Sequence, residues 1–397
     1  MTTTTALRIL VVHNRYREPG GEDAVVAAET ALLRRHGHTV VEYVDDNRRI
    51  DSLGPLAAAT QTVWSRPTRR RLRALLREQT IDVAHVHNTL FLVSPSAYSA
   101  CRDAGVPVVQ TVHNYRLACA AATFYRAGRP CEDCLGRAPW PGILHACYRE
   151  NRALTALVAT TVTVHRWLGT WRSAVDLYVA TTDFQRQKLV STGLPEERIV
   201  VKPHFVDPDP GESGRKGGYA LYVGRLAPEK GLGTLLDGWA RLPDIPLKVA
   251  GDGPLADGAR ARLAERGQSN VELVGRVSRD GVFELLRQAR LLVFPSECYE
   301  TFGMAIVEAF ACGVPVVASR LGAMAEIVAD GRTGLLFRPG DPDDLGRAVR
   351  RLWDDPALAA RLGRGARVEY DGRYTAERNY HALMNCYRRV VEGIRTR

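Results

Sequence analysis

Short apolar runs alternate with longer amphipathic stretches along most of this sequence. In the first half, runs rich in valine, isoleucine and leucine predict strands at 7–13, 40–43, 83–87, 106–113 and 176–181. A second series predicts strands at 219–224, 246–251, 271–275, 290–296, 314–319 and 334–337. The stretches between these runs are amphipathic, and this alternation is typical of parallel sheets covered by helices.

A segment rich in proline, glycine and charge, DPDPGESGRKGG at 207–218, separates the two series and indicates a linker. We therefore predict an α/β fold of two Rossmann-like doubly wound domains that face a cleft. The first would occupy residues 1–206 and the second residues 207–373, and a last helix over 374–397 would pack back on the first. Ligands of such sheets bind at the carboxyl ends of the strands, so the chemistry is expected there.

Composition and charge are those of an ordinary globular protein, with one exception. Of the 397 residues, 45% are hydrophobic and 25% are charged, which is enough apolar material for two cores. The net charge is +10, and part of it is concentrated in RPTRRRLRALLR at 66–77. This run is either a solvated helix face or a surface that attracts an anionic membrane or a phosphorylated substrate. Because no aromatic residue interleaves these arginines and no nucleic-acid fingerprint follows, we predict no nucleic-acid partner.

Targeting and membrane-spanning signals are weak. The opening MTTTTALRILVVH lacks a charged region before its apolar run, and no segment reaches about 18 uninterrupted apolar residues. The best candidate, ALTALVATTVTVHRWL at 153–168, contains four threonines, a histidine and an arginine, which indicate a packed helix. We predict a cytoplasmic protein whose membrane contact, if it has one, is peripheral and made by 66–77.

The stretch ECYETFGMAIVEAFACG at 297–313 carries two glutamates, Glu300 and Glu308, around a turn from a strand into a helix. The first amides of a helix have no intrahelical partner and lie at the positive end of its dipole, so this turn is suited to a diphosphate. A carboxylate beside the turn suits sugar hydroxyls, which donate hydrogen bonds to it. Taken alone, either glutamate is better explained as a capping residue or an exposed helix residue.

The segment ETFGMAIVEAFACGVPVVAS resembles the Glu-x7-Glu signature of family-4 retaining glycosyltransferases, which have the GT-B fold. Four further pieces follow the order and spacing of that family: GRLAPEKG (224–231), AGDGP (250–254), GAMAEIV (322–328) and GRTGLLFRPGD (331–341). Each short glycine-rich piece is a weak match. Together they extend the resemblance over nearly the whole chain and make it specific.

The resemblance implies how a nucleotide-sugar donor would bind. In that family the first glutamate binds hydroxyls of the donor sugar and the second binds ribose hydroxyls, which assigns these roles to Glu300 and Glu308. Further donor contacts are implied at the amides of Thr301, Phe302 and Gly303 and at the strand end Gly275 and Arg276. The donor would be a UDP- or GDP-linked sugar, and catalysis would require no cofactor.

The segment YVGRLAPEKG at 222–231 ends a predicted strand at Gly224 and places two cations, Arg225 and Lys230, beyond it. Breaking a sugar–phosphate bond leaves a nucleoside diphosphate with a new negative charge, and fixed cations in a dry cleft stabilise that charge. An arginine can bind two phosphate oxygens at once, whereas a lysine acts as a point charge. An ordinary basic turn is the alternative. The family resemblance assigns both cations to the donor diphosphate.

Two Asp-x-Asp pairs raise the question of a metal. Glycosyltransferases of another fold use such a pair to hold a divalent ion against the diphosphate. Here Asp207-x-Asp209 lies in the predicted linker, and Asp341-x-Asp343 lies at a predicted helix start beside Pro342. Because neither pair directly follows a strand, we interpret both as structural and expect catalysis without Mg²⁺.

In the first half, paired glycines and a histidine lie at strand ends. Gly20 and Gly21 directly precede a helical pattern, where they either let the backbone approach a phosphate or form a flexible loop. The resemblance places this pair, Gly21 above all, against the donor phosphate. It also implies that His113 is a catalytic-site residue that orients donor and acceptor. The aspartate that usually follows is Asn114 here, so no role is assigned to a carboxylate at that position.

Four of the eight cysteines fall within one insert after His113, residues 119–147. Their spacing includes one Cys-x-x-Cys, and the four are Cys119, Cys131, Cys134 and Cys147. A structural zinc site, reduced buried thiols, and a disulfide or redox role all remain open.

Three functions follow from these patterns. The leading one, which the family resemblance implies, is a retaining, metal-independent glycosyltransferase of hexosyltransferase type that uses a front-face mechanism. In that mechanism the departing diphosphate helps deprotonate the acceptor hydroxyl. A nucleotide-sugar 2-epimerase of the same fold would need no acceptor, and a silent nucleotide-sugar-binding protein would bind without turnover. The donor base, the sugar, the acceptor and the oligomeric state are not encoded in any motif that we identify.

Overall fold

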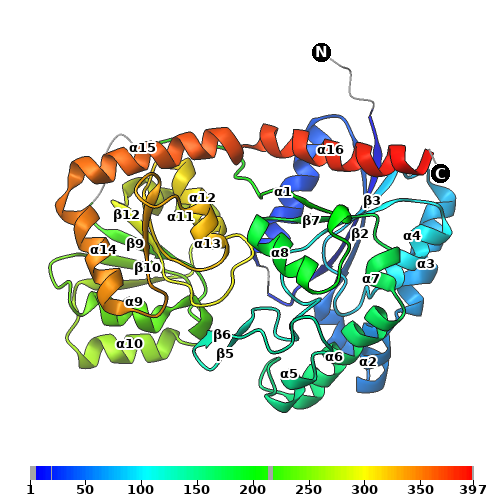
Figure 1. Ribbon diagram of the computed structural model, residues 1–397, viewed down its shortest axis with the longest axis horizontal. Coiled ribbons are helices and arrows are strands. Elements are labelled where there is room, and N and C mark those ends of the chain that lie inside the picture. The colour runs from blue at the N-terminus through cyan, green and yellow to red at the C-terminus, as the bar shows by residue number, and fades with distance from the viewer. Residues whose placement is uncertain (1–5, 19, 213–217, 396–397) are drawn as a thin grey trace. The chain divides into compact units, whose positions relative to one another are not determined.

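The computed structural model describes residues 6–18, 20–212 and 218–395. They form two compact units, each with its own six-stranded sheet (Figure 1). Unit 1 comprises Met1–Thr123, Glu132–Pro203 and Asn379–Arg397, and unit 2 comprises Phe124–Cys131 and His204–Arg378. Part of the predicted linker, 213–217, and the first five residues of the opening segment lie outside the described residues.

The sheet of unit 1 is parallel, in the order β2-β1-β3-β4-β7-β8. Its strands are β1 (Arg8–Arg15), β2 (Thr39–Asp46), β3 (Val83–Val86), β4 (Val108–Thr111), β7 (Leu177–Ala180) and β8 (Ile199–Val201). The helices of this part of the chain are α1 (Gly21–Arg35), α2 (Pro55–Val63), α3 (Arg66–Glu78), α4 (Ser96–Asp103), α5 (Trp140–Leu144), α6 (Arg152–Trp167), α7 (Thr170–Ser173), α8 (Asp183–Ser191) and α16 (Ala376–Arg395). The order reverses between β1 and β3, so the carboxyl ends of these two strands are where a ligand is expected.

The sheet of unit 2 is also parallel, in the order β11-β10-β9-β12-β13-β14. Its strands are β9 (Ala220–Val223), β10 (Leu247–Ala250), β11 (Val271–Gly275), β12 (Leu291–Phe294), β13 (Val316–Ser319) and β14 (Gly334–Phe337). Its helices are α9 (Leu232–Trp239), α10 (Ala256–Glu265), α11 (Arg279–Gln288), α12 (Met304–Ala311), α13 (Ala323–Ile327), α14 (Pro342–Asp354) and α15 (Pro356–Arg373). The order reverses between β9 and β12, as in dinucleotide-binding folds.

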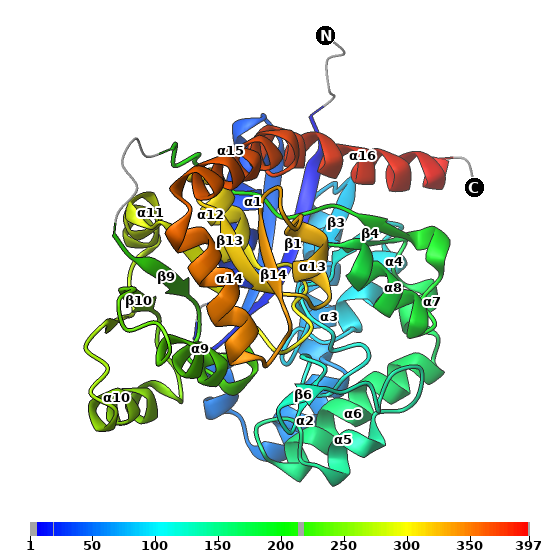
Figure 2. The ribbon, with the colours of Figure 1, turned by 60° about the vertical axis from the view of Figure 1, so that its left-hand side comes forward.

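Helices cover both faces of the second sheet, and the alternation of strand residues explains why. Leu292 of β12 packs with α11, α12 and α13 in one apolar cluster. Its neighbours Leu291 and Val293 point the other way, into a second cluster with α9, α10 and α14. Figure 2 shows this unit from another side. Because both faces are buried, the strands are continuous apolar runs, as the sequence pattern predicts.

The predicted fold of two doubly wound α/β domains is confirmed, and all eleven predicted strands are present. The pattern missed the three-residue strand β8 and the short hairpin β5 (Tyr125–Arg126) and β6 (Arg129–Pro130). The hairpin interrupts unit 1 in sequence but clusters with unit 2. Among the described helices, none has both the length and the apolar content needed to cross a bilayer.

Candidate functional site

The strands β9 and β12 lie side by side at the centre of the second sheet, with Ala220 opposite Leu291. Beyond β9 the chain forms a loop and a short 3₁₀ turn, Pro228–Lys230, before α9 begins. Beyond β12 it forms the loop that carries Glu300 and then enters α12. The predicted cations and the first predicted glutamate therefore meet at one edge of one sheet.

Lys230 and Glu300 form the centre of this edge. Lys230 Nζ donates to Glu300 Oε1 at 2.6 Å, and Ser296 Oγ donates to the same oxygen at 2.6 Å. Burial raises the pKa of the Glu300 carboxyl, but the Lys230 charge and the two hydrogen bonds outweigh it and hold that pKa below 4.5. Burial likewise lowers the pKa of Lys230, and the Glu300 charge raises it well above its ordinary value. Both groups are charged at neutral pH.

The loop that carries Lys230 is fixed against the end of β12. Gly231 has φ +70°, and a Cβ there would lie 1.9 Å from the carbonyl oxygen of Pro295, so only glycine fits. Ser296 Oγ also lies 3.1 Å from the Glu229 carbonyl oxygen, and the amide of Glu297 donates to the same carbonyl at 2.9 Å. The two loops are therefore held in one arrangement by backbone as well as side-chain contacts.

Arg225, the second predicted cation, lies at the end of β9 but points into solvent. Its side chain is 60% exposed and pairs with Glu229, one turn away. The Arg225 carbonyl accepts from Tyr222 Oη at 3.0 Å, which holds the backbone. An exposed guanidinium on a held backbone can turn toward a phosphate, but here its partner is a carboxylate of its own loop.

The predicted donor amides lie at the start of α12. Gly303 is the N-cap residue, with φ +96°, a conformation that favours glycine. Phe302 is buried and packs edge-on against Tyr374 and His204, so its side chain belongs to the core and anchors the turn. The amides of Thr301, Phe302 and Gly303 therefore belong to a turn that the buried Phe302 side chain holds in place.

Glu308, the second predicted glutamate, is a half-buried residue of α12. Burial raises the pKa of its carboxyl above 4.5, and the charge of Arg279 opposes that shift. Glu300 pairs with Lys230, whereas Glu308 has no ion-pair partner among the described residues of unit 2. The two glutamates of the motif thus sit in different electrostatic environments.

The remaining predicted glycines of unit 2 differ in what they do. A Cβ on Gly251 would lie 1.9 Å from the carbonyl oxygen of Gly224, so AGDGP packs directly on the loop that follows β9. Gly275 ends β11 with φ +79° and open space around it, and Arg276 follows. The first contact explains on structural grounds why residue 251 is a glycine, whereas a Cβ on Gly224 would meet Tyr222 Oη at 3.1 Å.

Both Asp-x-Asp pairs are used by the fold. Asp209 pairs with Arg367 at 2.6 Å. Asp341 caps α14, accepting from the amides of Asp343 and Asp344 at 3.0 and 2.9 Å. Asp343 pairs with Arg241 at 3.0 Å. These contacts agree with the structural interpretation of both motifs.

In unit 1, His113 follows β4 and its Nε2 lies 3.0 Å from Nδ1 of His87, which follows β3. The two rings are stacked, with centroids 5.2 Å apart. His113 and His87 line a small pocket of about 50 Å³ together with Asn114 and Arg116. Asn88, Leu90 and Pro95, which follow β3 in the chain, line the same pocket.

Of the paired glycines, Gly20 is the N-cap of α1 and Gly21 is its first residue. A Cβ on Gly20 or Gly21 would meet nothing within 4 Å, so neither is required by packing there. The Gly20 amide donates to Asp23 Oδ2 at 2.9 Å, and Asp23 Oδ1 lies 2.9 Å from His13 Nε2. Glu22 accepts from Tyr16 Oη at 2.9 Å, and burial raises the pKa of its carboxyl to about 7.

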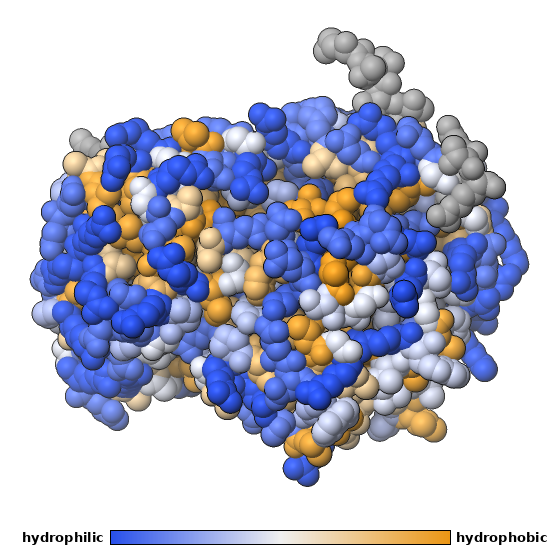
Figure 3. Space-filling model, viewed as in Figure 1, coloured by the Kyte–Doolittle hydropathy of each residue, from blue (hydrophilic) through white to orange (hydrophobic). Residues whose placement is uncertain are grey.

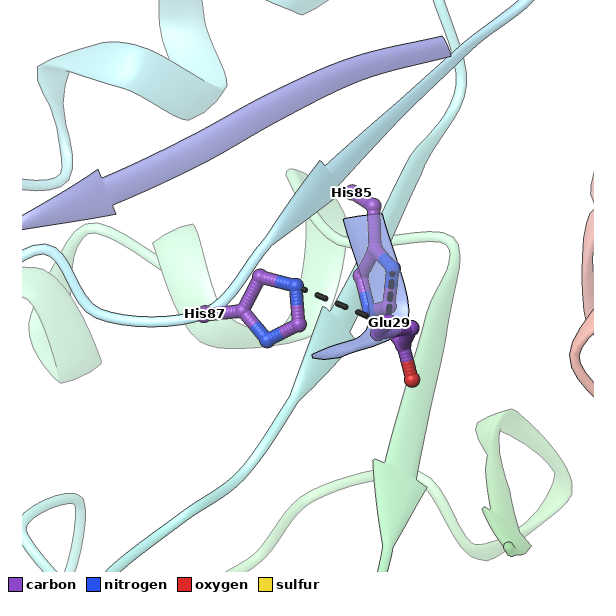
Figure 4. Close-up of side chains that lie close together, drawn as sticks. All are labelled: Glu29, His85 and His87. Carbon is purple, nitrogen blue, oxygen red and sulfur yellow. Dashed lines mark ion pairs between the residues drawn. The ribbon is translucent and has the colours of Figure 1, made fainter. Parts of the chain in front are cut away.

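A buried charged cluster lies behind His87. Glu29 of α1 is 2% exposed, and its carboxylate lies 3.1 Å from His85 Nδ1 and 3.7 Å from His87 Nε2 (Figure 4). The carboxylate also lies 2.9 Å from Lys202 Nζ. Burial raises the pKa of Glu29, and Lys202 more than offsets this, leaving it well below 4.5. Burial, followed by the neighbouring His85, lowers the pKa of His87 well below 6.5.

Glu29, His85 and His87 are residues of types that can bind a metal ion, and among the described residues their ligand atoms all lie within 4.8 Å of one another. The Lys202 ammonium occupies one carboxylate oxygen of Glu29, and both nitrogens of His85 have partners, Tyr387 Oη at 2.7 Å and Thr111 Oγ1 at 2.8 Å. A cation here would lie beside a fixed ammonium. The donor set therefore suits an ion-pair network better than a metal.

The four clustered cysteines are divided between the units. Cys119, Cys134 and Cys147 belong to unit 1, and Cys131 belongs to the hairpin segment of unit 2. Cys119 and Cys134 are buried, and the other two are half-buried. Among the described residues, no three of these four cysteines have their sulfur atoms within 4.8 Å of one another. Zinc at these cysteines stays a prediction.

Sequence reasoning missed Ser296, which fixes Glu300, and the buried cluster of Glu29 and Lys202. Ser296 is the last residue of the run RLLVFPS, so its place at a strand end was a usable signal. Glu29 and Lys202 are 173 residues apart, and no local pattern links them.

Comparison with known families gives two consecutive matches. The model described as "Glycosyltransferase Family 4" matches residues 19–210, and the model described as "Glycosyl transferases group 1" matches residues 207–369. Glycogen synthase of Mycobacterium tuberculosis is 32% identical over 299 residues, 72% of this chain and 63% of its own. An uncharacterised glycosyltransferase of Methanocaldococcus jannaschii is 34% identical over 174 residues, 44% of this chain. The chain spans 63% and 49% of the length of these two curated relatives.

Solved structures share the fold. Anabaena HepE, in complex with UDP and glucose, has a TM-score of 0.68 at 17% identity, covering 96% of this chain and 98% of its own. Sucrose-phosphate synthase of Thermosynechococcus elongatus has a TM-score of 0.72 at 18% identity, covering 98% of this chain and all of its own. These likenesses confirm the predicted GT-B fold. With both family models matched in order across residues 19–369, the chain belongs to the family-4 glycosyltransferases.

Proposed function

We propose that this protein transfers a hexose from a nucleoside diphosphate sugar to an acceptor hydroxyl, with retention of configuration and without a divalent metal. The observation that carries the proposal is the Lys230–Glu300 pair at the switch point of the second sheet. One member can neutralise the departing diphosphate, and the other can accept from the donor sugar. The two are fixed to adjacent strand ends, so they need little reorganisation when substrate binds.

The donor would lie with its diphosphate toward Lys230, Arg225 and the amides before α12. Lys230 is 27% exposed and remains protonated far above neutral pH, so it offers a permanent charge to the phosphate. Arg225 would exchange Glu229 for a phosphate oxygen. Glu308, whose carboxyl lies further along α12, is proposed to accept from the ribose hydroxyls, and Gly275 and Arg276 to flank the base.

The contacts of Glu300 favour a binding role over a nucleophilic one. Its Oε1 already accepts two hydrogen bonds of 2.6 Å, which reduces the basicity of that oxygen and fixes the carboxylate. We therefore propose that Glu300 accepts from a sugar hydroxyl and that the departing diphosphate takes the proton of the acceptor hydroxyl. Both the bond to the leaving group and the new bond then lie on one face of the sugar.

On the acceptor side we propose that His113 orients the sugar and the incoming hydroxyl. The neutral His87 beside it fixes the His113 ring through one hydrogen bond, and Gly20 and Gly21 leave open space for a phosphate. The complex of HepE with UDP makes a UDP-linked hexose the first donor to test, with a GDP-linked hexose second. Here His113 is proposed to orient groups, and no base role is assigned to it.

Product release from a panel of nucleotide sugars, with and without an acceptor pool, tests the function. Acceptor-dependent release of nucleoside diphosphate, unchanged by EDTA, is the expected result. Isomerisation of the nucleotide sugar without an acceptor would identify the protein as an epimerase. Tight binding of a nucleotide sugar without turnover would identify it as a non-catalytic binding protein. Loss of turnover in EDTA that Mg²⁺ restores would contradict the metal-independent mechanism.

A further inference from the structure

Unit 1 carries an unusual concentration of exposed apolar side chains. Nine large apolar residues are well exposed in the described chain, and seven of them lie on or at the ends of α2, α5 and α6. Trp167 is 82% exposed, Leu56 79% and Leu144 58%. Figure 3 shows hydrophobic side chains at the lower edge of the molecule, where Figure 1 labels these three helices. Such a concentration is more than the scattered exposure of a typical surface.

A row of arginines borders this region. Most of these arginines have another three or four residues away along α3, so they share one helix face; they are Arg66, Arg69, Arg70, Arg73 and Arg77. With Trp64 they line a groove of about 400 Å³. We call the groove and the apolar side chains of α2, α5 and α6 the α2–α6 surface.

Trp64 joins the arginine row to the apolar region. It follows α2, lines the groove, and stacks on His165 of α6, with ring centroids 6.1 Å apart. Trp167 and Leu168 follow two and three residues later, at the end of α6. Trp64 therefore connects the arginine groove to α6, the helix that ends in the exposed Trp167 and Leu168.

The positive charge of the groove is only partly balanced. Asp103 of α4 pairs with Arg69 at 2.6 Å and approaches Arg73 at 4.0 Å. Arg66, Arg70 and Arg77 have no carboxylate within ion-pair distance in the part of the chain that the structure describes. Like charges along one helix face repel each other, so an anionic partner would reduce this repulsion.

We propose that the α2–α6 surface docks on a lipid bilayer that contains anionic phospholipids. The arginine groove would hold lipid phosphates, and the indole and leucine side chains would enter the boundary between headgroups and acyl chains. Tryptophan favours that boundary because its ring is apolar and its N–H remains hydrated. Nucleic acid offers phosphates but no apolar layer beside them. The surface belongs to unit 1 and lies outside the donor-binding residues of unit 2.

Sedimentation of the full-length protein with vesicles tests this proposal. We expect binding to vesicles of phosphatidylcholine mixed with phosphatidylglycerol, and little binding to phosphatidylcholine alone. Arg70→Gln with Arg77→Gln should weaken binding about 25-fold, at about fivefold for each arginine removed. Trp167→Ser with Leu168→Ser should weaken binding to the anionic vesicles while the salt dependence stays that of the unmodified protein. Circular dichroism checks that each variant is folded.

Matched changes outside the surface provide the control. Arg361→Gln with Arg364→Gln removes two exposed arginines from α15, and Val368→Ser removes an apolar side chain that is 67% exposed there. Neither should alter vesicle binding. Equal affinity for neutral and anionic vesicles, absence of binding to both, or equal losses in control and surface variants would each overturn the proposal. A dimer in analytical ultracentrifugation that dissociates in the Trp167→Ser variant would assign the surface to a second copy of the chain instead.

Discussion

Replacing Lys230 by methionine is the sharpest test of the donor site. The substitution keeps the length of the side chain and removes its charge. Glu300 then loses the donor that lies 2.6 Å from its Oε1, while the bond from Ser296 remains. The fold should survive, because Lys230 lies at a loop surface and contributes no side chain to the apolar clusters of unit 2.

The expected loss follows from the charge that the reaction creates. Two unit charges about 4 Å apart interact by about 4 kcal/mol at an effective dielectric constant of about 20. Because Lys230 is 27% exposed, solvent screens part of this. About 3 kcal/mol of transition-state stabilisation remains, in line with the loss of one fixed donor to a developing charge, which is about 10²-fold in kcat.

The assay is nucleoside diphosphate release under saturating donor and acceptor, followed by the pH dependence of kcat. Without the Lys230 charge, burial should raise the pKa of Glu300. The acid side of the pH profile should therefore move to higher pH in the Lys230→Met variant. Lys248→Met is the matched control, since it removes another lysine of unit 2 that pairs with a glutamate, Glu272, at 3.5 Å.

Turnover of Lys230→Met within threefold of that of the unmodified enzyme would show that the Lys230 charge does not stabilise the departing diphosphate. So would an equal loss in Lys248→Met, because the effect would then come from the net charge of the unit. The double variant Lys230→Met with Glu300→Gln should lose less than the product of the two single losses, since the residues act as a pair.

Three further predictions use other parts of the structure. Glu308→Gln should raise KM for the donor about tenfold and leave kcat nearly unchanged, because the ribose is remote from the reacting carbon; steady-state kinetics with varied donor checks this. Gly231→Ala should lower the free energy of unfolding by about 2 kcal/mol or more and lower turnover, because the new Cβ would meet the Pro295 carbonyl; urea unfolding with and without donor measures it. For Glu22 the folded pKa of about 7 lies above the ordinary 4.5, so this group makes the protein less stable as pH rises from about 4.5 to 7. The free energy of unfolding of Glu22→Gln should therefore rise relative to that of the unmodified protein by up to about 3 kcal/mol from pH 5 to pH 8. The same difference between the two proteins at both pH values would contradict a raised pKa for the buried Glu22 carboxyl.

The strands could be predicted because both faces of each sheet are buried, so the strands are continuous apolar runs in the sequence. Leu291–Phe294 illustrates this, since all four residues are buried. The three residues of β8 are too few to stand out in that way, and only the first of them is fully buried. The hairpin at 125–130 has no apolar pattern, and it lies in the insert whose cysteines drew attention to metal chemistry.

The site was predictable as far as it is local in sequence. The family resemblance singled out Glu300 and Lys230, each of which lies near a glycine turn beyond a strand, and the sheet order places those strands side by side. Contacts between distant positions were not predictable. Nothing near Glu29 in the sequence points to Lys202, and the ion pair exists only because α1 packs across the sheet on which Lys202 follows β8.

A crystal structure with a bound nucleoside diphosphate sugar would test the central claim most directly. We predict a diphosphate oxygen within about 3 Å of Lys230 Nζ, a sugar hydroxyl donating to Glu300, and no metal ion between protein and phosphates. A nucleotide that binds away from the ends of β9 and β12, or one held through a coordinated divalent ion, would contradict it.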